Sequence, residues 1–269
     1  MTQITVKKLW KEYGNQVVLE NVNLNVADHE FVTIVGASGC GKTTFLRMLL
    51  GVEIPTRGEF LIDGQRLPEE PGPDRGIVFQ RYSLFPHLTV LENLLLGLEL
   101  NGSPLLCRLF GARRREAIAK ADRLLDAVGL DAARDKYPAQ LSGGMQQRLS
   151  IAQSVICEPK VLLLDEPFGA LDPGVTADMH ELILKLWNMN RMTIFMVTHD
   201  LKESFLLGTR LLVFDKVRQD SQEPDRFGAT ITYNIPLKGQ RSIVALDAAR
   251  IATEVKVGLG LGQGQRADG

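Results

Sequence analysis

The spacing of apolar residues along the chain predicts strands that alternate with helices. Residues 4–10 and 17–27 alternate polar and apolar positions, which is typical of strands with one buried face. A continuous apolar run, Phe31–Val35, predicts a buried strand that ends at Gly36. Three further short apolar runs predict buried parallel strands, at Val161–Leu164, Thr193–Val197 and Leu211–Phe214. Strands alternating with helices in this way indicate an α/β core.

Helices are indicated by apolar stripes and by the residues that begin or end them. We expect a helix over Thr43–Leu50, with Gly51 as the residue that ends it. Residues 112–128 place one apolar face toward a core and stop at Gly129; that face holds Ile118, Ala121, Leu125 and Val128. The chain also has a Thr89–Glu92 capping box.

Two more local patterns complete the predicted elements. Asp172 followed by Pro173 is a favourable start for a helix. The apolar stripe of that helix comprises Val175, Met179, Leu182, Ile183 and Leu186. Gly58–Leu67, which contains Asp63-Gly64, predicts a hairpin, and 230–235 is strand-like.

Composition narrows the class of protein. Hydrophobic residues make up 45% of the 269 and the formal net charge is −1, so we expect a folded chain without nucleic acid as a partner. The three cysteines (Cys40, Cys107 and Cys157) show no metal spacing and no disulfide framework, which favours a reducing compartment. No membrane span and no signal peptide are visible.

One segment has the full pattern of a phosphate-binding loop: Gly36-Ala37-Ser38-Gly39-Cys40-Gly41-Lys42-Thr43. It lies between a predicted strand and a predicted helix, where backbone N–H groups and the helix dipole both face an anion. Lys42 adds a charge for the β- and γ-phosphates, and the Thr43 hydroxyl is suited to Mg²⁺. We expect this segment and Thr44 to bind ATP, with Cys40 as a small filler.

Two adjacent carboxylates, Asp165 and Glu166, end the strand that begins at Val161. Ligands gather at the C-terminal ends of parallel strands. Asp165 is therefore a candidate ligand for Mg²⁺, and Glu166 a candidate to orient and polarise the attacking water. A solvated turn is the alternative for two acids at a strand end, and the phosphate-binding loop in the same chain argues against it.

The segment Leu141-Ser142-Gly143-Gly144-Met145 resembles the LSGGQ signature of ABC ATPases, with Met145 at the fifth position. The phosphate-binding loop, this segment and the acid pair occur in the order typical of that family. The resemblance covers about residues 4–215. It implies an α/β P-loop NTPase (ABC cassette) with an N-terminal antiparallel β part, a parallel α/β core and an inserted helical subdomain at about 86–145.

The resemblance assigns roles to four further residues. Gln80 looks like the Q-loop glutamine, which contacts Mg²⁺, and Asp172 like the D-loop aspartate. His199 resembles the switch histidine that contacts the γ-phosphate, and Tyr13 the aromatic residue that stacks on adenine. A lone histidine after a strand is more often structural, and a tyrosine at a strand end is often packing. Because His199 and Tyr13 occur together with the other family motifs, the functional interpretation is favoured for both.

The family mechanism then follows as an expectation. Two cassettes, identical or different, meet head to tail, so that Ser142 and Gly144 act on the partner's nucleotide. The expected catalytic residues are Lys42, Gln80, Glu166 and His199. The expected Mg²⁺ ligands are Thr43, Gln80 and Asp165. Because every residue of a competent site is present, hydrolysis is expected as well as binding of ATP.

Among ABC proteins, the chain resembles a transporter motor. It holds one cassette, whereas translation-type proteins carry two, and it lacks the long coiled coil of chromosome and repair ATPases. The stretch 73–86 is similar to the nitrate/sulfonate/taurine importers. The implied partners are transmembrane permease subunits and a solute-binding protein. The resemblance implies that the chain itself lies at the cytoplasmic face of a bacterial inner membrane, as a peripheral subunit. An exporter ATPase and a soluble non-transport ATPase remain the alternatives, and the solute is not readable.

Three segments depart from the family pattern. Ser103–Arg115 combines leucines with arginines. It suits either contact with the membrane or permease or, as we prefer, a solvated lead into a helix. Residues 216–256 are expected to form a small C-terminal appendage, for which no ligand is indicated. The glycine-rich tail 257–269 is expected to be disordered.

Overall fold

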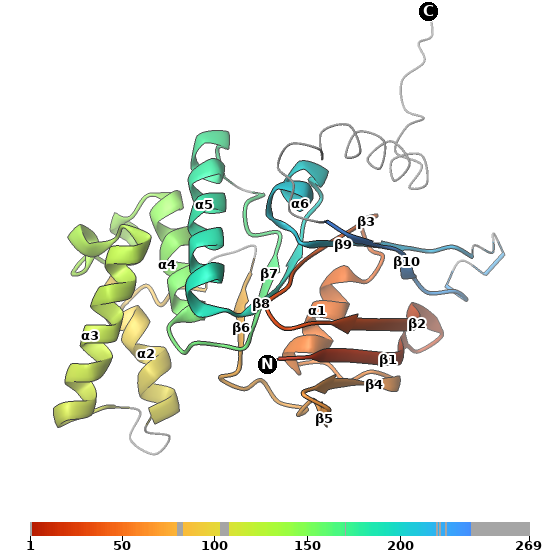
Figure 1. Cartoon of the computed structure of the whole chain (residues 1–269), viewed down its shortest axis with the longest axis horizontal. Coiled ribbons are helices and arrows are strands. Elements are labelled where there is room, and N and C mark those ends of the chain that lie inside the picture. The colour runs from red at the N-terminus through yellow and green to blue at the C-terminus, as the bar shows by residue number, and fades with distance from the viewer. Residues whose placement is uncertain are drawn as a thin grey trace, which may run out of the picture. The chain divides into compact units, whose positions relative to one another are not determined.

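The structure is a computed structural model that describes residues 2–79, 83–102, 108–169, 171–218, 220, 222–223 and 225–237 (Figure 1). The described residues form two compact units, which are treated separately here. The first combines residues of Met1–Glu70 with residues of Phe195–Gly269, and the second comprises Pro71–Ile194. The α/β class expected from the sequence is confirmed, with antiparallel and parallel sheets together.

The first unit contains an antiparallel sheet. Its strand order is β2 (Gln16–Val26), β1 (Ile4–Tyr13), β4 (Arg57–Ile62) and β5 (Gln65–Arg66). Most apolar positions of β1 and β2 are buried, but the alternation slips once in each strand, at Lys8 and Asn21, which both have positive φ. Both strands continue the pairing to Tyr13 and Gln16, beyond the end expected for the first strand. The hairpin between β4 and β5 turns at Asp63 and Gly64, which both have positive φ.

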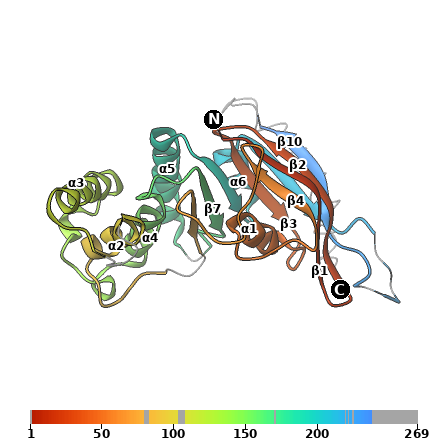
Figure 2. The ribbon, with the colours of Figure 1, turned by 90° about the horizontal axis from the view of Figure 1, so that it is seen from below.

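The strands of the second sheet that lie in this unit follow the order β10 (Thr230–Pro236), β9 (Arg210–Asp215), β3 (Phe31–Gly36) and β8 (Thr193–Val197). β3 and β9 are parallel, with Gly36 opposite Phe214. β10 pairs antiparallel with β9, which confirms the strand expected at 230–235. Figure 2 shows β10 beside β2.

Helix α1 (Lys42–Leu50) is fixed by an aromatic core. The ring of Phe45 lies 5.4 Å from Phe60 of the first sheet and 5.3 Å from Phe214 of the second, centroid to centroid. All three side chains are buried. Aromatic pairs at this separation contribute about 0.5–1.5 kcal/mol each beyond the area that they bury. The helix that follows the phosphate-binding loop is therefore held from both sheets.

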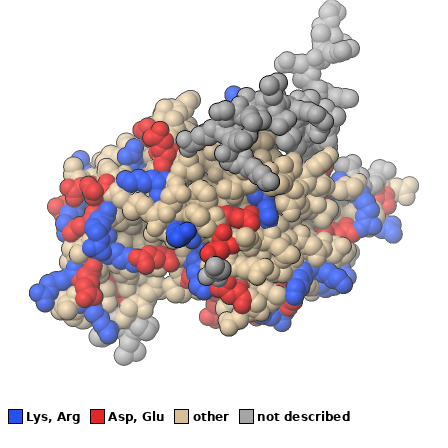
Figure 3. Space-filling view, viewed as in Figure 1, with Lys and Arg blue, Asp and Glu red and all other residues tan. Residues whose placement is uncertain are grey.

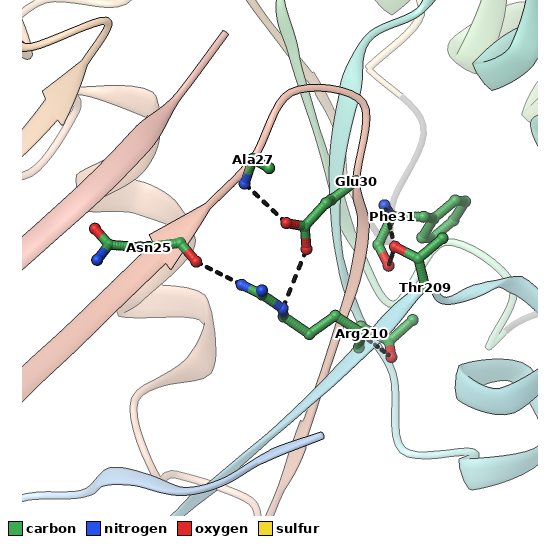
Figure 4. A network of polar contacts seen from close by, with 7 residues as sticks. Asn25, Ala27, Glu30, Phe31, Thr209 and Arg210 are labelled. Carbon is green, nitrogen blue, oxygen red and sulfur yellow. Dashed lines mark hydrogen bonds and ion pairs between the residues drawn. The ribbon is translucent and has the colours of Figure 1, made fainter. Parts of the chain in front are cut away.

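A polar network joins the two sheets of the first unit (Figure 4). The carboxylate of Glu30 accepts from the N–H of Ala27 at 2.8 Å and pairs with Arg210 at 3.1 Å. Arg210 also donates to the carbonyl of Asn25 at the end of β2. One residue earlier, the Thr209 hydroxyl accepts from the N–H of Phe31 at 2.9 Å. The network fixes the start of β3, the strand that leads into the phosphate-binding loop.

The second unit contains two parallel strands, β6 (Arg75–Val78) and β7 (Val161–Asp165). Its helices are α2 (Val90–Gly102), α3 (Gly111–Val128), α4 (Gly143–Val155) and α5 (Pro173–Asn190). Short 3₁₀ turns lie at Asp131–Ala133 and Pro138–Gln140. The remaining helix, α6 (Leu201–Leu207), belongs to the first unit.

The local signals of the second unit are largely confirmed. Glu92 accepts from the N–H and the hydroxyl of Thr89, at 2.8 and 3.0 Å, which completes the capping box. Gly129 ends α3 with φ +69. In the apolar face of α3, however, Ala117 is buried while Ile118 is only half-buried. The buried face is rotated slightly from the predicted one, because 3.6 residues per turn bring position 117 in line with 121, 125 and 128.

Helix α5 begins at Pro173, as predicted, with Asp172 as its N-cap. The Asp172 side chain makes no capping bond among the described residues; its carbonyl accepts from the N–H of Thr176 at 2.9 Å. Val175, expected in the buried stripe, is half-buried, and His180 is buried in that stripe instead. A histidine was not expected there, because its polar ring usually lies outside an apolar stripe.

Charges are interspersed on the face of the molecule seen in Figure 3, where Lys and Arg alternate with Asp and Glu. Among the described residues, no helix is both long enough and apolar enough to cross a membrane. The expectations for residues 103–107 and for the tail 257–269 lie outside the described residues.

Candidate functional site

The phosphate-binding loop connects β3 to α1 in the first unit. Gly39 and Gly41 have φ of +78 and +88, a region that residues with a side chain rarely adopt. Gly41 is the N-cap of α1, and no side chain caps the helix there. The first N–H groups of any α-helix have no acceptor within the helix, which is the property that makes a helix start bind anions.

Two glycines of this loop also have no room for a side chain. A Cβ on Gly36 would lie 2.3 Å from the carbonyl oxygen of Phe214 on β9. A Cβ on Gly41 would lie 2.8 Å from Leu19 and 2.9 Å from Val18, both on β2. The loop is thus packed against both sheets of its unit, so its cradle shape depends on glycine for packing as well as for φ.

Lys42 is buried within the loop that precedes it. Its Nζ donates to the carbonyls of Gly36 and Ala37, each at 2.9 Å. The ammonium group therefore lies over the cradle rather than extending into solvent, and only 8% of the residue is exposed. Burial raises the pKa of the Cys40 thiol, so the reactive thiolate is disfavoured. Cys40 itself is buried, in keeping with the filler role expected for it.

Tyr13 lies at the end of β1 in the same unit, and 45% of it is exposed. Its hydroxyl donates to the carboxylate of Glu53, which follows α1. The ammonium of Lys11 lies 4.7 Å from the ring centroid. The ring is therefore tethered at its hydroxyl while part of it stays accessible, as a stacking residue requires.

His199 is exposed one residue after Thr198, whose N–H donates to the carbonyl of Ile34 on β3 at 3.1 Å. The Thr198 hydroxyl donates to Glu203 at 2.5 Å, and it accepts from the N–H of Asp200 at 3.0 Å. Asp200 in turn caps α6. These bonds fix the turn that carries His199 beside the strand that leads into the phosphate-binding loop.

The acid pair ends β7 in the second unit, and both carboxylates are half-buried. Glu166 has φ +48, a left-handed conformation that is strained for a residue with a side chain. Strain of this kind costs about 1–3 kcal/mol and gathers at functional sites. The loop that follows is ordered by the N–H of Leu171, which donates to Phe168 at 3.1 Å.

The signature segment forms the N-terminus of α4. Ser142 is the N-cap, and its hydroxyl accepts from the N–H of Met145 at 3.3 Å. A Cβ on Gly144 would lie 2.7 Å from Val175 of α5. Gly144 therefore allows α4 to pack closely on α5.

Two buried amides of the second unit were missed by sequence reasoning. Gln147 of α4 donates to the carbonyl of Pro167 at 2.7 Å, directly after the acid pair. Asn93 of α2 accepts from the N–H of Phe85 at 2.9 Å and donates to three carbonyls, of Phe85, Leu88 and Thr89. Asn93 thus orders the segment after the expected Q-loop. Gln80 itself lies outside the described residues.

The expected appendage reaches the phosphate-binding region of its unit through β2. The N–H of Val17 donates to the carbonyl of Asp225, and the N–H groups of Glu20 and Ala229 complete a short pairing with this strand, all at 2.9 Å. Arg218 pairs with Glu20 and stacks on Phe227. These contacts fall next to Val18 and Leu19, the residues that pack on Gly41.

The fold and these loops define a P-loop nucleotide hydrolase. The family described as ABC transporter matches residues 19–169, more than half of the chain. Together with the relatives described below, this match shows that the chain belongs to the ABC transporter family and is an ATP-hydrolysing, ATP-binding subunit.

Three similar proteins support this assignment. The nitrate import ATP-binding protein NrtD of Synechocystis is 44% identical over 83% of this chain and 78% of its own length. The bicarbonate transport ATP-binding protein CmpD of the same organism is 44% identical, over 78% of this chain and 73% of its own. The dimeric post-hydrolysis structure of the cassette MJ0796, bound to ADP and Pi, is 30% identical with a TM-score of 0.69, and the match covers 88% of this chain and all of that one. The resemblance to the nitrate importer group is confirmed.

Proposed function

We propose that this chain energises a bacterial importer for a small anionic solute, of the kind represented by nitrate, bicarbonate, sulfonate or taurine. The observation that carries the proposal is the 44% identity to a nitrate import and a bicarbonate transport ATP-binding protein across most of the chain. A cassette does not contact the solute, so nitrate and bicarbonate rest on these relatives, and sulfonate and taurine rest on the similarity of the stretch 73–86.

Within this function, the phosphate-binding loop holds the phosphates of ATP and Tyr13 stacks on its adenine. Lys42 provides the charge for the β- and γ-phosphates, and the N–H groups at the start of α1 donate to them. Glu166 orients the attacking water, and His199 and Gln80 contact the γ-phosphate end. The reaction transfers a phosphoryl group to water, so positioning and charge stabilisation supply most of the rate enhancement.

Mg²⁺ is the metal that this chemistry implies. The proposed ligands are the Thr43 hydroxyl, the Asp165 carboxylate and Gln80, all of them oxygen donors, which suit a hard cation. Among the described residues, no group of three or more acidic, histidine or cysteine side chains could hold a metal ion without the nucleotide. That donor set fits Mg²⁺, which is usually bound by one or two carboxylates together with phosphates. When bound, it neutralises charge on the phosphates.

The signature segment is proposed to act on the nucleotide of a second cassette, identical or different. Ser142 caps α4, and the N–H groups of Gly143 and Gly144 begin the helix, as an anion site requires. The dimeric arrangement of MJ0796 supports pairing of cassettes. Asp172, the expected D-loop aspartate, directly precedes α5. Ala170, two residues earlier, lies outside the described residues.

The proposed partners in the membrane are permease subunits, with a solute-binding protein in the complete system, and the chain is proposed to lie at the cytoplasmic face as a peripheral subunit. In the basic segment Ser103–Arg115, the described residues 108–115 are less suited to membrane contact than their composition indicates. Arg114 pairs with Glu99 at 3.0 Å, and Leu109 is buried. Phe110 and Arg113 remain exposed.

Affinity purification of the tagged chain from gently solubilised membranes tests this proposal. We expect a multi-span permease in stoichiometric amount, identified by mass spectrometry, and a solute-binding protein encoded with it. The Arg113→Ala/Arg115→Ala variant is the matched control, and we expect it to retain the permease. An ATPase that stays soluble without membrane partners in repeated detergents would overturn the transport assignment; a permease without a solute-binding protein would overturn import.

A further inference from the structure

Gln147 is a buried side chain that links the signature helix to the acid pair. It lies on α4 in the second turn after Ser142, the N-cap of that helix. Its Nε2 donates to the carbonyl of Pro167 at 2.7 Å, and Pro167 follows Glu166 directly. The residue is fully buried, with 0% exposed. A well-formed hydrogen bond in such surroundings is stronger than the same bond in water.

The loop that receives this bond needs support. Glu166 has φ +48, a conformation that persists only where neighbouring structure holds it. Beyond Pro167, the buried ring of Phe168 lies 4.9 Å from the ring of His180 on α5. Within the loop, the N–H of Gly169 reaches the carbonyl of Glu166 only at 3.4 Å. The bond from Gln147 joins this loop directly to α4.

A role as core filler explains Gln147 less well. Its Oε1 is buried and has no hydrogen-bond partner among the described residues. Burying an unpaired amide oxygen costs free energy that an apolar side chain of the same size would avoid. The contribution of a glutamine at this position must therefore come from its donated bond to Pro167.

We propose that Gln147 is a positioning residue for Glu166. By holding the carbonyl of Pro167, it keeps the strained Glu166 backbone in place and so aims the carboxylate. This inference rests on the proposed role of Glu166 in orienting water. Because α4 begins with the signature segment, a shift of that helix is transmitted through Gln147 to the acid pair of the same chain.

The experiment compares two glutamines of the same helix. Gln147→Met keeps the length of the side chain but removes the donor. Gln153→Met is the matched control, because Gln153 donates to the carbonyl of Asn93, at 3.4 Å, and not to the acid loop. For Gln147→Met we expect kcat for ATP hydrolysis to fall about 10- to 100-fold with KM within roughly twofold, since small misplacements of a catalytic group cost this much. We expect Gln153→Met to keep wild-type kcat.

Two further readouts separate positioning from general damage. Glu166→Gln serves as reference, with an expected loss of about 10³-fold in single-turnover hydrolysis of radiolabelled ATP. Adding Gln147→Met to it should cause no further loss, because the positioned group is already gone. Hydrogen exchange of the amides at Gly169 and Leu171 should be faster in Gln147→Met without nucleotide, and unchanged in Gln153→Met.

Each outcome decides the question. Equal kcat in the two methionine variants, or a further loss on top of Glu166→Gln, would overturn the positioning role while leaving the proposed function standing. Normal hydrolysis by Glu166→Gln would overturn the role of Glu166 itself, and with it this inference. Should Gln147→Met fold poorly, Gln147→Asn removes one methylene, cannot reach Pro167 and is expected to show the same split between kcat and KM.

Discussion

The phosphate-binding loop and the acid loop reach unusual backbone conformations by different means. In the first, the positive φ values fall on Gly39 and Gly41, residues that adopt them without steric cost. In the second, a positive φ falls on Glu166, which carries the side chain that the chemistry requires. The first loop is shaped by its own backbone, whereas the second is held by side chains from α4 and α5.

This difference separates two kinds of functional dependence. A loop made by glycines is sensitive to any side chain added within it, while its surroundings need only leave space. A loop held from outside is sensitive to residues distant in the sequence, such as Gln147 and His180. Substitutions within the phosphate-binding loop and around the acid loop should distinguish these two kinds of dependence.

The largest effect is expected for Gly41→Ala. Its Cβ would meet Leu19 and Val18 at less than 3 Å, and its φ of +88 is strained for alanine. A cost of about 2–3 kcal/mol should weaken ATP binding roughly 100-fold. Isothermal titration with ATP and Mg²⁺ measures this.

Gly39→Ala is the control for that prediction. Its φ is +78, but a Cβ there would meet nothing within 4 Å. Only the conformational cost of about 1 kcal/mol remains, which corresponds to about fivefold weaker binding. Equal losses in the two variants would show that packing against β2 does not shape the cradle.

A smaller effect should appear when Glu166→Gly is compared with Glu166→Ala. Both variants lack the carboxylate, so their difference reports the left-handed backbone at φ +48 alone. We expect the glycine variant to be more stable by about 1 kcal/mol, which raises Tm by roughly 2–4 °C in a chain of this size. Thermal denaturation without nucleotide measures it. A more stable alanine variant would mean that no strain is held at this position.

The smallest effect concerns the capping box of α2, another structure held by side chains. Hydrogen bonds to the Glu92 carboxylate, first from the N–H of Thr89 and to a smaller extent from its hydroxyl, lower the pKa of Glu92 from its ordinary value of 4.5. The resulting stabilisation is present above pH 4.5 and is lost as the pH falls through the lowered pKa. Wild type should exceed Glu92→Gln by about 0.3 kcal/mol at neutral pH, a small value because Glu92 is exposed, and this advantage should vanish in acid. Denaturation at several pH values checks this; a constant difference would contradict it.

Predictions from the sequence are most accurate where the physical cause of a local structure lies within one short segment. The phosphate-binding pattern occupies eight consecutive residues, and every constrained position can be read from residue type. The residue that ends α1, Gly51, and the capping box are equally local, and both are found as expected. The predicted strands are present, although the pairing of β1 with β2 runs on to Tyr13 and Gln16. The acid pair is also visible, because an apolar strand leads into it.

Contacts between distant residues could not be predicted. The bond from Gln147 to Pro167 spans 20 positions, and no periodicity distinguishes a glutamine that will be buried from one that faces solvent. His180 lies in an apolar stripe because its ring packs on Phe168, a partner that the helix pattern does not reveal. The pairing of Asp225 with Val17 joins two segments that are far apart in the sequence and depends on the complete fold.

That pairing has a consequence for the behaviour of the molecule in solution. β2 is the outermost strand of the antiparallel sheet, and an outermost strand offers its N–H and C=O groups to any other extended chain. The segment from Asp225 to Ala229 occupies those groups at Val17, Val18 and Glu20. Gly228 permits the close approach, since a Cβ there would lie 2.9 Å from the backbone of Leu19. Residues between β9 and β10 thereby cover the first part of this edge, which reduces its capacity to pair with another extended chain.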